Sequence, residues 1–522
     1  MTGRPVVEPT TAPLTGRLGR NPAAVLHEHV LAPQFRFEVD HLLGWYRLVE
    51  RVLLAEYARM KLVTEAEAAS IAELLDEATA DRITADPAAN LSDICLALEQ
   101  HVLAGLPAVP PAWHVDRSRN DIQATAQLLY ARGELLDIAG ALLEVARGAW
   151  HRAGAVAHLP MPGYTHLQAA QVITPGFFLT ALVEHCLRTL RRLVVTYDEV
   201  NLSPLGAGAM SGQELPWDRD RMALLLGCAG PQSHALTAVA SRAWALEIAG
   251  ELSHFGVGLS RFVTDLMAWA SSAYGFVELP DELAGISAAM PQKKNYPVLE
   301  RIRGRTAHLT SLALDLGIGQ RATPYSNMVE VSKEAGSHLH DLFRSARGVL
   351  ALLQAVLENL RWRPERMRAA CDREFLGGFT LANRLTLDKG VPWRTAQVVV
   401  GRYVSAKLAI GDPLDRPDPP LLARLAAAAG HPVTEPEPLL RGLDSDGQLS
   451  VKCSAGSAHP DRVRDLLERQ DGALGRLARE LGRRRTTVDS AIRDVQALFA
   501  APPPAPTREA SPSPAAERGT AS

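Results

Sequence analysis

The chain contains no uninterrupted apolar run long enough to span a bilayer, which excludes a transmembrane helix. Its five cysteines are scattered without a Cys-x-x-Cys pair, so they suggest neither a zinc site nor a disulfide framework. Such cysteine usage fits a reducing compartment. A net charge of −3 gives no electrostatic case for nucleic acid or an anionic membrane as partner. Because the start also lacks the basic-then-apolar pattern of a signal peptide, we expect a cytoplasmic protein.

What the chain does contain is helical periodicity. Hydrophobic residues make up 47% and charged residues 22% of its 522 residues, which is ordinary for a globular protein of roughly three domains. Apolar residues recur at steps of three and four, which places them on one face of a helix and indicates core packing. Three such stripes are Leu135, Ile138, Leu142, Val145 and Ala149; Phe178, Leu182, Cys186, Leu190 and Leu193; and Trp244, Ile248, Leu252, Phe255 and Leu259.

Composition divides the chain into five stretches. Residues 1–20 are rich in Pro, Thr and Gly and are predicted to be a disordered leader, and the Pro/Ala/Ser-rich residues 499–522 a disordered tail. Between them we expect an N-terminal helical domain over 21–112, a long central bundle over 113–361 and a smaller helical domain over 362–498. Strand patterns are few. The prediction is a mainly α protein.

Two polar segments interrupt this periodicity in the first half of the chain. His114–Asp121 carries good helix caps, so it is predicted to open a helix whose free N–H groups and two arginines suit an anion. A solvated helix start is the alternative. Gly163–Gln168 sets His166 between a threonine and a leucine, in a loop or at a helix start. A structural histidine is the alternative there.

Two further segments lie downstream. Ser203–Gly212 is dense in small residues, so backbone there can approach a ligand, although a plain interhelical loop has the same composition. Gly285–Asn295 is the most specific: Ser287 stands in a flexible stretch that runs into Pro291, which is predicted to start a helix. Two lysines and an asparagine follow, and the helix then carries Glu300 and Arg303. A serine loop over a cationic site is hard to explain as packing.

Together and in this order, the four segments resemble the signatures of argininosuccinate lyase, within the fumarase and aspartase superfamily. The matching runs are Arg-Ser-Arg-Asn-Asp, Gly-Tyr-Thr-His-Leu-Gln, Pro-Leu-Gly-Ala-Gly-Ala and Met-Pro-Gln-Lys-Lys-Asn. The likeness extends from about Leu91 to Pro460. It implies three mainly helical domains, the central one giving long helices to a homotetramer core, and active sites built from three subunits. It also implies a small-molecule substrate; we expect no cofactor and no metal.

The resemblance assigns roles in an elimination from an N-substituted aspartate that gives fumarate and an amine. Ser287 matches the catalytic base, His166 the histidine that we assign as general acid, and Glu300 the carboxylate that orients it. Lys293 and Asn295 match positions that bind the carboxylate next to the reacting carbon, where negative charge builds up. The fumarate portion is assigned to Ser118, Asn120 and Thr165, with Arg119 in the same shell.

Departures from the family pattern concentrate on the amine half of the substrate. Tyr325 and Lys333 are kept and counted as substrate-binding, but Glu330 replaces a neutral glutamine and adds a carboxylate that favours a cationic leaving group. Near the start, His29 and Pro33 fall roughly where the family has an aspartate and a serine. In the serine loop, Ile286 and Ala288 are atypical.

The sequence therefore indicates a carbon–nitrogen lyase of the amidine-lyase type whose substrate need not be argininosuccinate. Two alternatives stay open: a housekeeping argininosuccinate lyase of arginine biosynthesis, and a non-catalytic structural homologue. The amine, the favoured direction, the pathway and the division of the two protons between Ser287 and His166 are not determined at this level.

Overall fold

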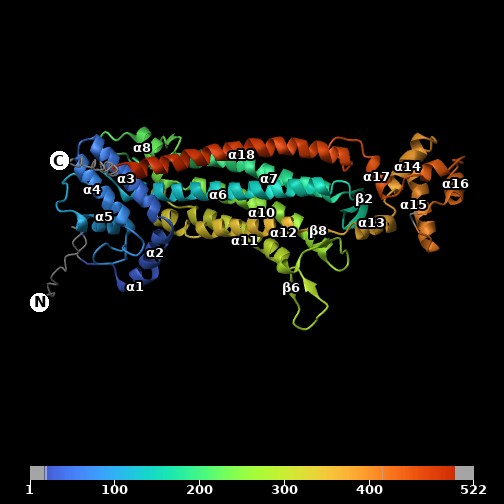
Figure 1. The fold of residues 1–522 in the computed structure, drawn as a ribbon, viewed down its shortest axis with the longest axis horizontal. Coiled ribbons are helices and arrows are strands. Elements are labelled where there is room, and N and C mark those ends of the chain that lie inside the picture. Colours follow the sequence, from blue (N-terminus) through green and yellow to red (C-terminus); the bar gives the residue numbers. More distant parts are fainter. Residues whose placement is uncertain (1–16, 18–19, 414–415, 500–522) are drawn as a thin grey trace, which may run out of the picture.

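The computed structural model of the protein describes residues 17, 20–413 and 416–499. The expected leader and tail lie outside these residues, apart from Arg17, Arg20 and Phe499. The molecule is elongated, with long helices along its length and groups of shorter helices at both ends (Figure 1). The mainly α prediction is confirmed. No helix of the described part is both long enough and apolar enough to cross a membrane.

The first helices form one end of the molecule. Thr64 caps α4 (Glu65–Glu77) in a capping box, because its hydroxyl accepts from the Glu67 N–H and the Glu67 carboxylate accepts from the Thr64 N–H. Asp93 caps α5 by accepting from Cys95 and Leu96 N–H groups. The elements are α1 (Ala24–Leu26), the π-helix η1 (His27–Leu31), α2 (Ala32–His41), α3 (Leu43–Arg59), α4 (Glu65–Glu77) and α5 (Ile94–Gly105).

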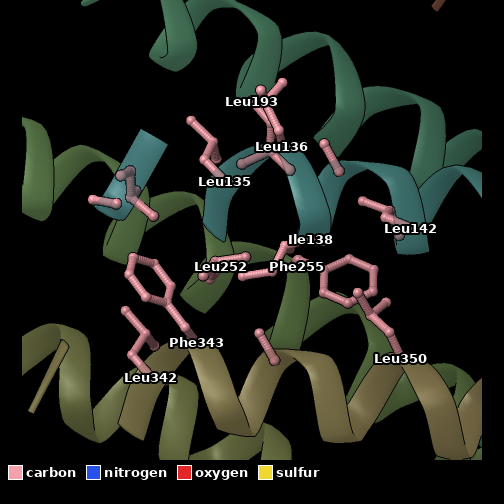
Figure 2. Close-up of a cluster of buried hydrophobic side chains, with 14 of the residues drawn as sticks. Leu135, Leu136, Ile138, Leu142, Leu193, Leu252, Phe255, Leu342, Phe343 and Leu350 are labelled. Carbon is pink, nitrogen blue, oxygen red and sulfur yellow. The ribbon is translucent and has the colours of Figure 1, made fainter. Parts of the chain in front are cut away.

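Long helices build the central bundle of the described chain, and the three predicted stripes lie in its core, with Phe178 packed against it. Figure 2 shows buried side chains of four helices gathered in this core: Leu135, Leu136, Ile138 and Leu142 from one, Leu193 from the second, Leu252 and Phe255 from the third, and Leu342, Phe343 and Leu350 from the fourth. Burying such a side chain contributes about 1.5–3 kcal/mol, so the stripes hold the bundle together. The bundle helices are α6 (Arg119–Ala155), α7 (Pro175–Val200), α10 (Ala243–Ala270), α11 (Pro297–Gln320) and α12 (Leu339–Asn359), with the short α8 (Arg219–Leu225) and α9 (Ala235–Ala240) nearby.

The region after residue 362 divides between two places. Residues from Leu381 to Leu440 share a hydrophobic cluster of their own at the far end of the molecule. The last helix, α18 (Pro460–Ala497), instead returns along the bundle and buries Leu474, Leu481 and Val495 in the central core. α18 thus packs along the central bundle, away from the cluster at the far end. The other elements after residue 362 are α13 (Pro364–Arg373), α14 (Gly378–Leu387), α15 (Trp393–Ala409), α16 (Pro419–Ala428), the 3-10 helix η4 (Glu437–Leu440) and α17 (Ser445–Ser450). A second 3-10 helix, η2 (Asp281–Leu283), lies earlier in the chain.

In the residues that the structure describes, the strands are short and occur in pairs, as the sparse strand pattern predicts. Three pairs are antiparallel: β1 (Met161–Thr165) with β2 (Gln168–Ile173), β5 (Val277–Glu278) with β8 (Arg361–Trp362), and β6 (Gly285–Ile286) with β7 (Lys294–Asn295). One pair is parallel, β3 (Leu202–Ser203) with β4 (Gly230–Pro231). The hairpins β1–β2 and β6–β7 matter most, because each carries predicted site residues out of the bundle.

Candidate active site

The predicted site residues fall at three separate places on the chain. The start of α6 and the nearby π-helix η3 (Glu330–Glu334) form the first, the β1–β2 hairpin the second and the β6–β7 hairpin with the start of α11 the third. The first two lie at opposite ends of α6 (Figure 1). A helix of 37 residues is about 55 Å long at 1.5 Å per residue. One chain therefore cannot bring all three places together.

At the start of α6, the predicted cap is present. Ser118 is the N-cap residue, and its hydroxyl accepts from the Asn120 N–H at 3.2 Å. Arg119 is exposed and pairs with Asp93, with 2.9 Å between Nη1 and Oδ2. The Asn120 amide donates to the carbonyl of Ala209 at 2.9 Å. These residues present polar groups at the positive end of a long helix dipole, which suits a carboxylate.

The glycine-rich loop is held against this helix by Asp121. Its buried carboxylate accepts from the N–H groups of Gly206 and Gly208 at 2.9 and 3.0 Å. Burial raises the pKa of Asp121 to about 6, although the two N–H groups act in the opposite direction. Both glycines have positive φ, and a Cβ on Gly208 would lie 2.5 Å from the Gly212 carbonyl oxygen. The backbone of this loop therefore binds a carboxylate, as its small residues allow, but the carboxylate is that of Asp121 in the same chain and not that of a ligand.

The amine-side residues gather near the same end of the molecule. Lys333 forms an ion pair with the buried Glu38, whose pKa is raised by burial and lowered in part by that lysine. Both residues line a cavity of about 360 Å³, together with His29 and Pro33. Of the other predicted residues, Glu330 is exposed in the first turn of η3.

Tyr325 stands just before this turn. Its side chain is 62% exposed, and its hydroxyl lies 3.5 Å from the Thr237 hydroxyl. It is not among the described residues that line the cavity beside Lys333. Core packing therefore does not account for it.

His166 stands at the tip of the β1–β2 hairpin, so of the two predicted settings, a loop or a helix start, the loop is the one observed. Thr165 pairs with Gln168, and the two residues between them, His166 and Leu167, have φ of 53° and 61°. Positive φ at both central positions is the requirement of a type I′ turn, which usually takes asparagine and glycine. Such strained residues concentrate at functional sites. Thr165, His166 and Leu167 are all exposed, so packing does not explain them.

Ser287 lies in the second hairpin, which projects from the side of the bundle (Figure 1). Its hydroxyl accepts from the Met290 N–H at 3.1 Å. Ile286 beside it is 92% exposed. Exposed Lys293 and half-buried Asn295 line a cavity of about 560 Å³, whose wall also includes exposed Glu300 in the first turn of α11. Lys294 is engaged elsewhere, because it pairs with Asp281 at 2.7 Å, which raises the pKa of the lysine.

The predicted helix start at Pro291 is wrong. Residues Pro291 and Gln292 form a turn, Lys294 and Asn295 form β7, and α11 begins only at Pro297. The backbone of β7 bonds to β6, which closes the hairpin and delays the helix. Ser287 is consequently not at a helix N-terminus, and the N–H group beside its hydroxyl comes from the hairpin turn.

His166 and Glu300 belong to different places. In the described part of the chain, no hydrogen bond or ion pair joins these two side chains. The structure does bring Asn120, Lys333 and Glu38 to one end, and Lys293, Asn295 and Glu300 around one cavity.

Several polar residues of this region are missed by sequence reasoning. Glu38 stands on α2 between apolar neighbours, and a charged residue at a buried helix position is the signal that would have revealed it. Gln123 and Gln127 on α6 and Arg242 before α10 form a hydrogen-bonded cluster that meets η3 at the Ser332 carbonyl. They carry no motif, so only the structure reveals them.

Comparisons with known proteins show which family the chain resembles. Residues 34–309 match a family described as lyase. The argininosuccinate lyase of Thermus thermophilus is 35% identical over 398 residues, which cover 74% of this chain and 82% of the relative. That of Methanothrix thermoacetophila is 32% identical over 404 residues, covering 77% and 82%.

Solved structures share the fold. An EDDS lyase variant with bound fumarate superposes with a TM-score of 0.80 at 23% identity, over 90% of this chain and 95% of that one. The recombinant class II fumarase from Schistosoma mansoni gives a TM-score of 0.61 at 14% identity, over 74% and 87%. The chain is therefore a carbon–nitrogen lyase and belongs to the argininosuccinate lyase-like family of the fumarase and aspartase superfamily, as its fold, its four motifs in order and a match over more than half of its length show.

Proposed function

We propose that this enzyme eliminates an amine from an N-substituted aspartate to give fumarate, with amine addition to fumarate as the reverse reaction. The observation that carries the proposal is the placement of Ser287, His166, Glu300, Lys293 and Asn295. All five lie on projecting hairpins or at a helix start, and none belongs to the hydrophobic core. Packing therefore does not require them, whereas the elimination does.

The separation of the three places supports a site shared between copies of the chain. The start of α6 and the His166 hairpin are about 55 Å apart, the length of a 37-residue helix. Assembly of a homotetramer would place a hairpin from one subunit beside the helix start of another. We propose this assembly in the cytoplasm.

The chemistry follows from the side chains. Ser287 Oγ takes the proton from the carbon next to the carboxylate, the carbon–carbon double bond forms, and the carbon–nitrogen bond breaks. His166, oriented by Glu300, gives a proton to the leaving nitrogen. Lys293 and Asn295 stabilise the carboxylate on which negative charge accumulates before the bond breaks.

A serine base must be prepared for proton removal, because an alkoxide is costly in water. The Met290 N–H already donates to Ser287 Oγ, and such a bond favours the ionised form. Lys293 lies on the same hairpin and supplies positive charge. Closure of this exposed hairpin over substrate would remove water and strengthen both effects.

For the leaving group, we propose a cationic amine that is not restricted to arginine. Glu330 is exposed at the amine side, and Glu38 adds a second carboxylate in the cavity next to it. Glu334 also lines this cavity, so three carboxylates and one lysine leave that side negative overall, which attracts a second positive charge on the amine.

The test is fumarate release, followed by ultraviolet absorbance, from argininosuccinate and from other N-substituted aspartates. Ser287→Ala should lower kcat by about 100-fold or more while substrate still binds. Ser70→Ala is the matched control, since Ser70 is an exposed serine that bonds only within α4. Equal turnover by the Ser287 and Ser70 variants would refute the assigned role.

The amine that the enzyme prefers distinguishes the proposed function from that of a housekeeping argininosuccinate lyase. The reverse reaction with fumarate and a panel that includes arginine and ethylenediamine reports the preference directly. If the gene complements an arginine auxotroph and arginine is the best amine, the protein is a housekeeping argininosuccinate lyase, and the proposal of a leaving group not restricted to arginine is overturned. If no N-substituted aspartate is turned over, the catalytic proposal fails.

A further inference from the structure

A buried cluster of amide groups ties α6 to the π-helix that carries Lys333. The side-chain amides of Gln123 and Gln127 both donate to the Ser332 carbonyl, at 3.1 and 2.7 Å. Arg242, at the start of α10, donates from Nε to the Gln127 side-chain oxygen at 3.0 Å. We call the two glutamines and the Ser332 carbonyl the amide clamp.

Arg242 fixes the orientation of this clamp. A guanidinium only donates, so Gln127 must turn its oxygen to Arg242 and its NH₂ to Ser332. Arg242 is 4% exposed, and its remaining bonds go to the Val239 and Ser241 carbonyls. Burial lowers its pKa to about 10, so the arginine keeps its charge near neutral pH. Gln127 therefore has one arrangement available, whereas an isolated amide would have two.

The clamp acts on a turn that needs outside support. A π-helix is a wide turn, and the carbonyls at its end lack partners within the helix. Ser332 is the residue directly before Lys333, whose ammonium meets Glu38 in the cavity of about 360 Å³. Its carbonyl is therefore a fixed point from which Lys333 extends on one side and Glu330 on the other.

We infer that Gln123 and Gln127 are positioning residues, which hold η3 so that Lys333 and Glu330 face the amine half of the substrate. This inference rests on the proposed function for the identity of the bound group. The contacts predict a local effect: loss of a clamp bond leaves the Ser332 carbonyl with a single buried partner, and η3 then opens more often.

Two variants test the clamp without removing a cavity-lining side chain altogether. Gln123→Val removes one donor, and Gln123 is not one of the described residues that line the cavity. Gln127→Glu keeps the size and the acceptor for Arg242 but cannot donate to Ser332 when ionised. Gln470→Leu is the matched control, because Gln470 is a buried glutamine on α18 that donates to the Thr180 carbonyl at 2.8 Å, remote from η3.

Two measurements decide the inference. Amide hydrogen exchange over residues 328–338 should become about tenfold faster in each clamp variant and stay unchanged in Gln470→Leu, since one buried hydrogen bond is worth about a factor of ten. In Gln123→Val, the KM for ethylenediamine or arginine, whichever turns over, should rise by about tenfold. Gln127→Glu serves the exchange measurement alone, because Gln127 lines the cavity and its new carboxylate would itself attract the amine. The KM for fumarate should change less than about twofold.

Unchanged exchange over this segment would overturn the clamp. Faster exchange with an unchanged KM for the amine would overturn its positioning role and leave only a structural one. If the wild-type enzyme turns over no amine with fumarate, the proposed function fails. The exchange measurement still decides whether the clamp holds η3.

Discussion

Asp121 should make the stability of this protein depend on pH in the direction opposite to most paired carboxylates. Its carboxylate is buried between α6 and the glycine-rich loop, and burial raises its pKa from 3.8 to about 6. The folded form then binds a proton more tightly than the unfolded chain. Its favourable contribution is complete below the unfolded pKa and is lost as pH rises through about 6.

The magnitude follows from the two pKa values. A difference of about two corresponds to about 3 kcal/mol, and about 2 kcal/mol of this is lost between about pH 4.5 and about pH 7.5. The free energy of unfolding in urea, measured for wild type and Asp121→Asn at one protein concentration, isolates this group. The advantage of wild type over the variant should shrink by about 2 kcal/mol across that range.

Asp116→Asn is the control for this measurement. Burial raises the pKa of Asp116, but bonds from the Leu215 and Glu214 N–H groups and from Trp217 outweigh it and lower the pKa overall. Asp116 therefore stays ionised in both states over the same range, and its difference from wild type should be constant. A constant or growing difference for Asp121 would show that the two glycine N–H groups outweigh burial, and the reasoning would be refuted.

Two further predictions concern the assembly and the loop. When Ser287→Ala and His166→Ala subunits are mixed after mild dissociation, fumarate release that neither variant shows alone should return, because a shared site can then combine an intact serine segment with an intact histidine segment. If oligomers that have exchanged subunits recover no activity, the site lies within one chain. Gly208→Ala should cost about 1–2 kcal/mol or more in unfolding free energy, since φ is +62° and its Cβ would lie 2.5 Å from the Gly212 carbonyl oxygen. Gly482→Ala on α18, with open space around the new methyl group, should be neutral or stabilising, and equal losses for both would contradict the role of backbone conformation.

The helices and their caps were readable from the sequence because they depend on neighbours in the chain. The stripe from Leu135 to Ala149 repeats at the helical period and is buried, and Ser118 caps α6 as its type and place predicted. The prediction that a helix starts at Pro291 failed because it also rested on local sequence alone. A proline suits a helix start locally, but pairing of β6 with β7 holds this segment in a hairpin until Pro297.

What the sequence by itself determined is which functional groups each short motif carries, since a hydroxyl, imidazole or ammonium group comes with its residue type. Tertiary structure alone decided where these motifs stand. Periodicity shows that a helix has an apolar face but not which faces meet, so it could not return α18 to the central bundle. Nor could it place the Ser332 carbonyl against Gln123 and Gln127, which lie more than 200 residues earlier. The length of α6, which runs from Ser118 toward the His166 hairpin, keeps the residues at its two ends apart within one chain.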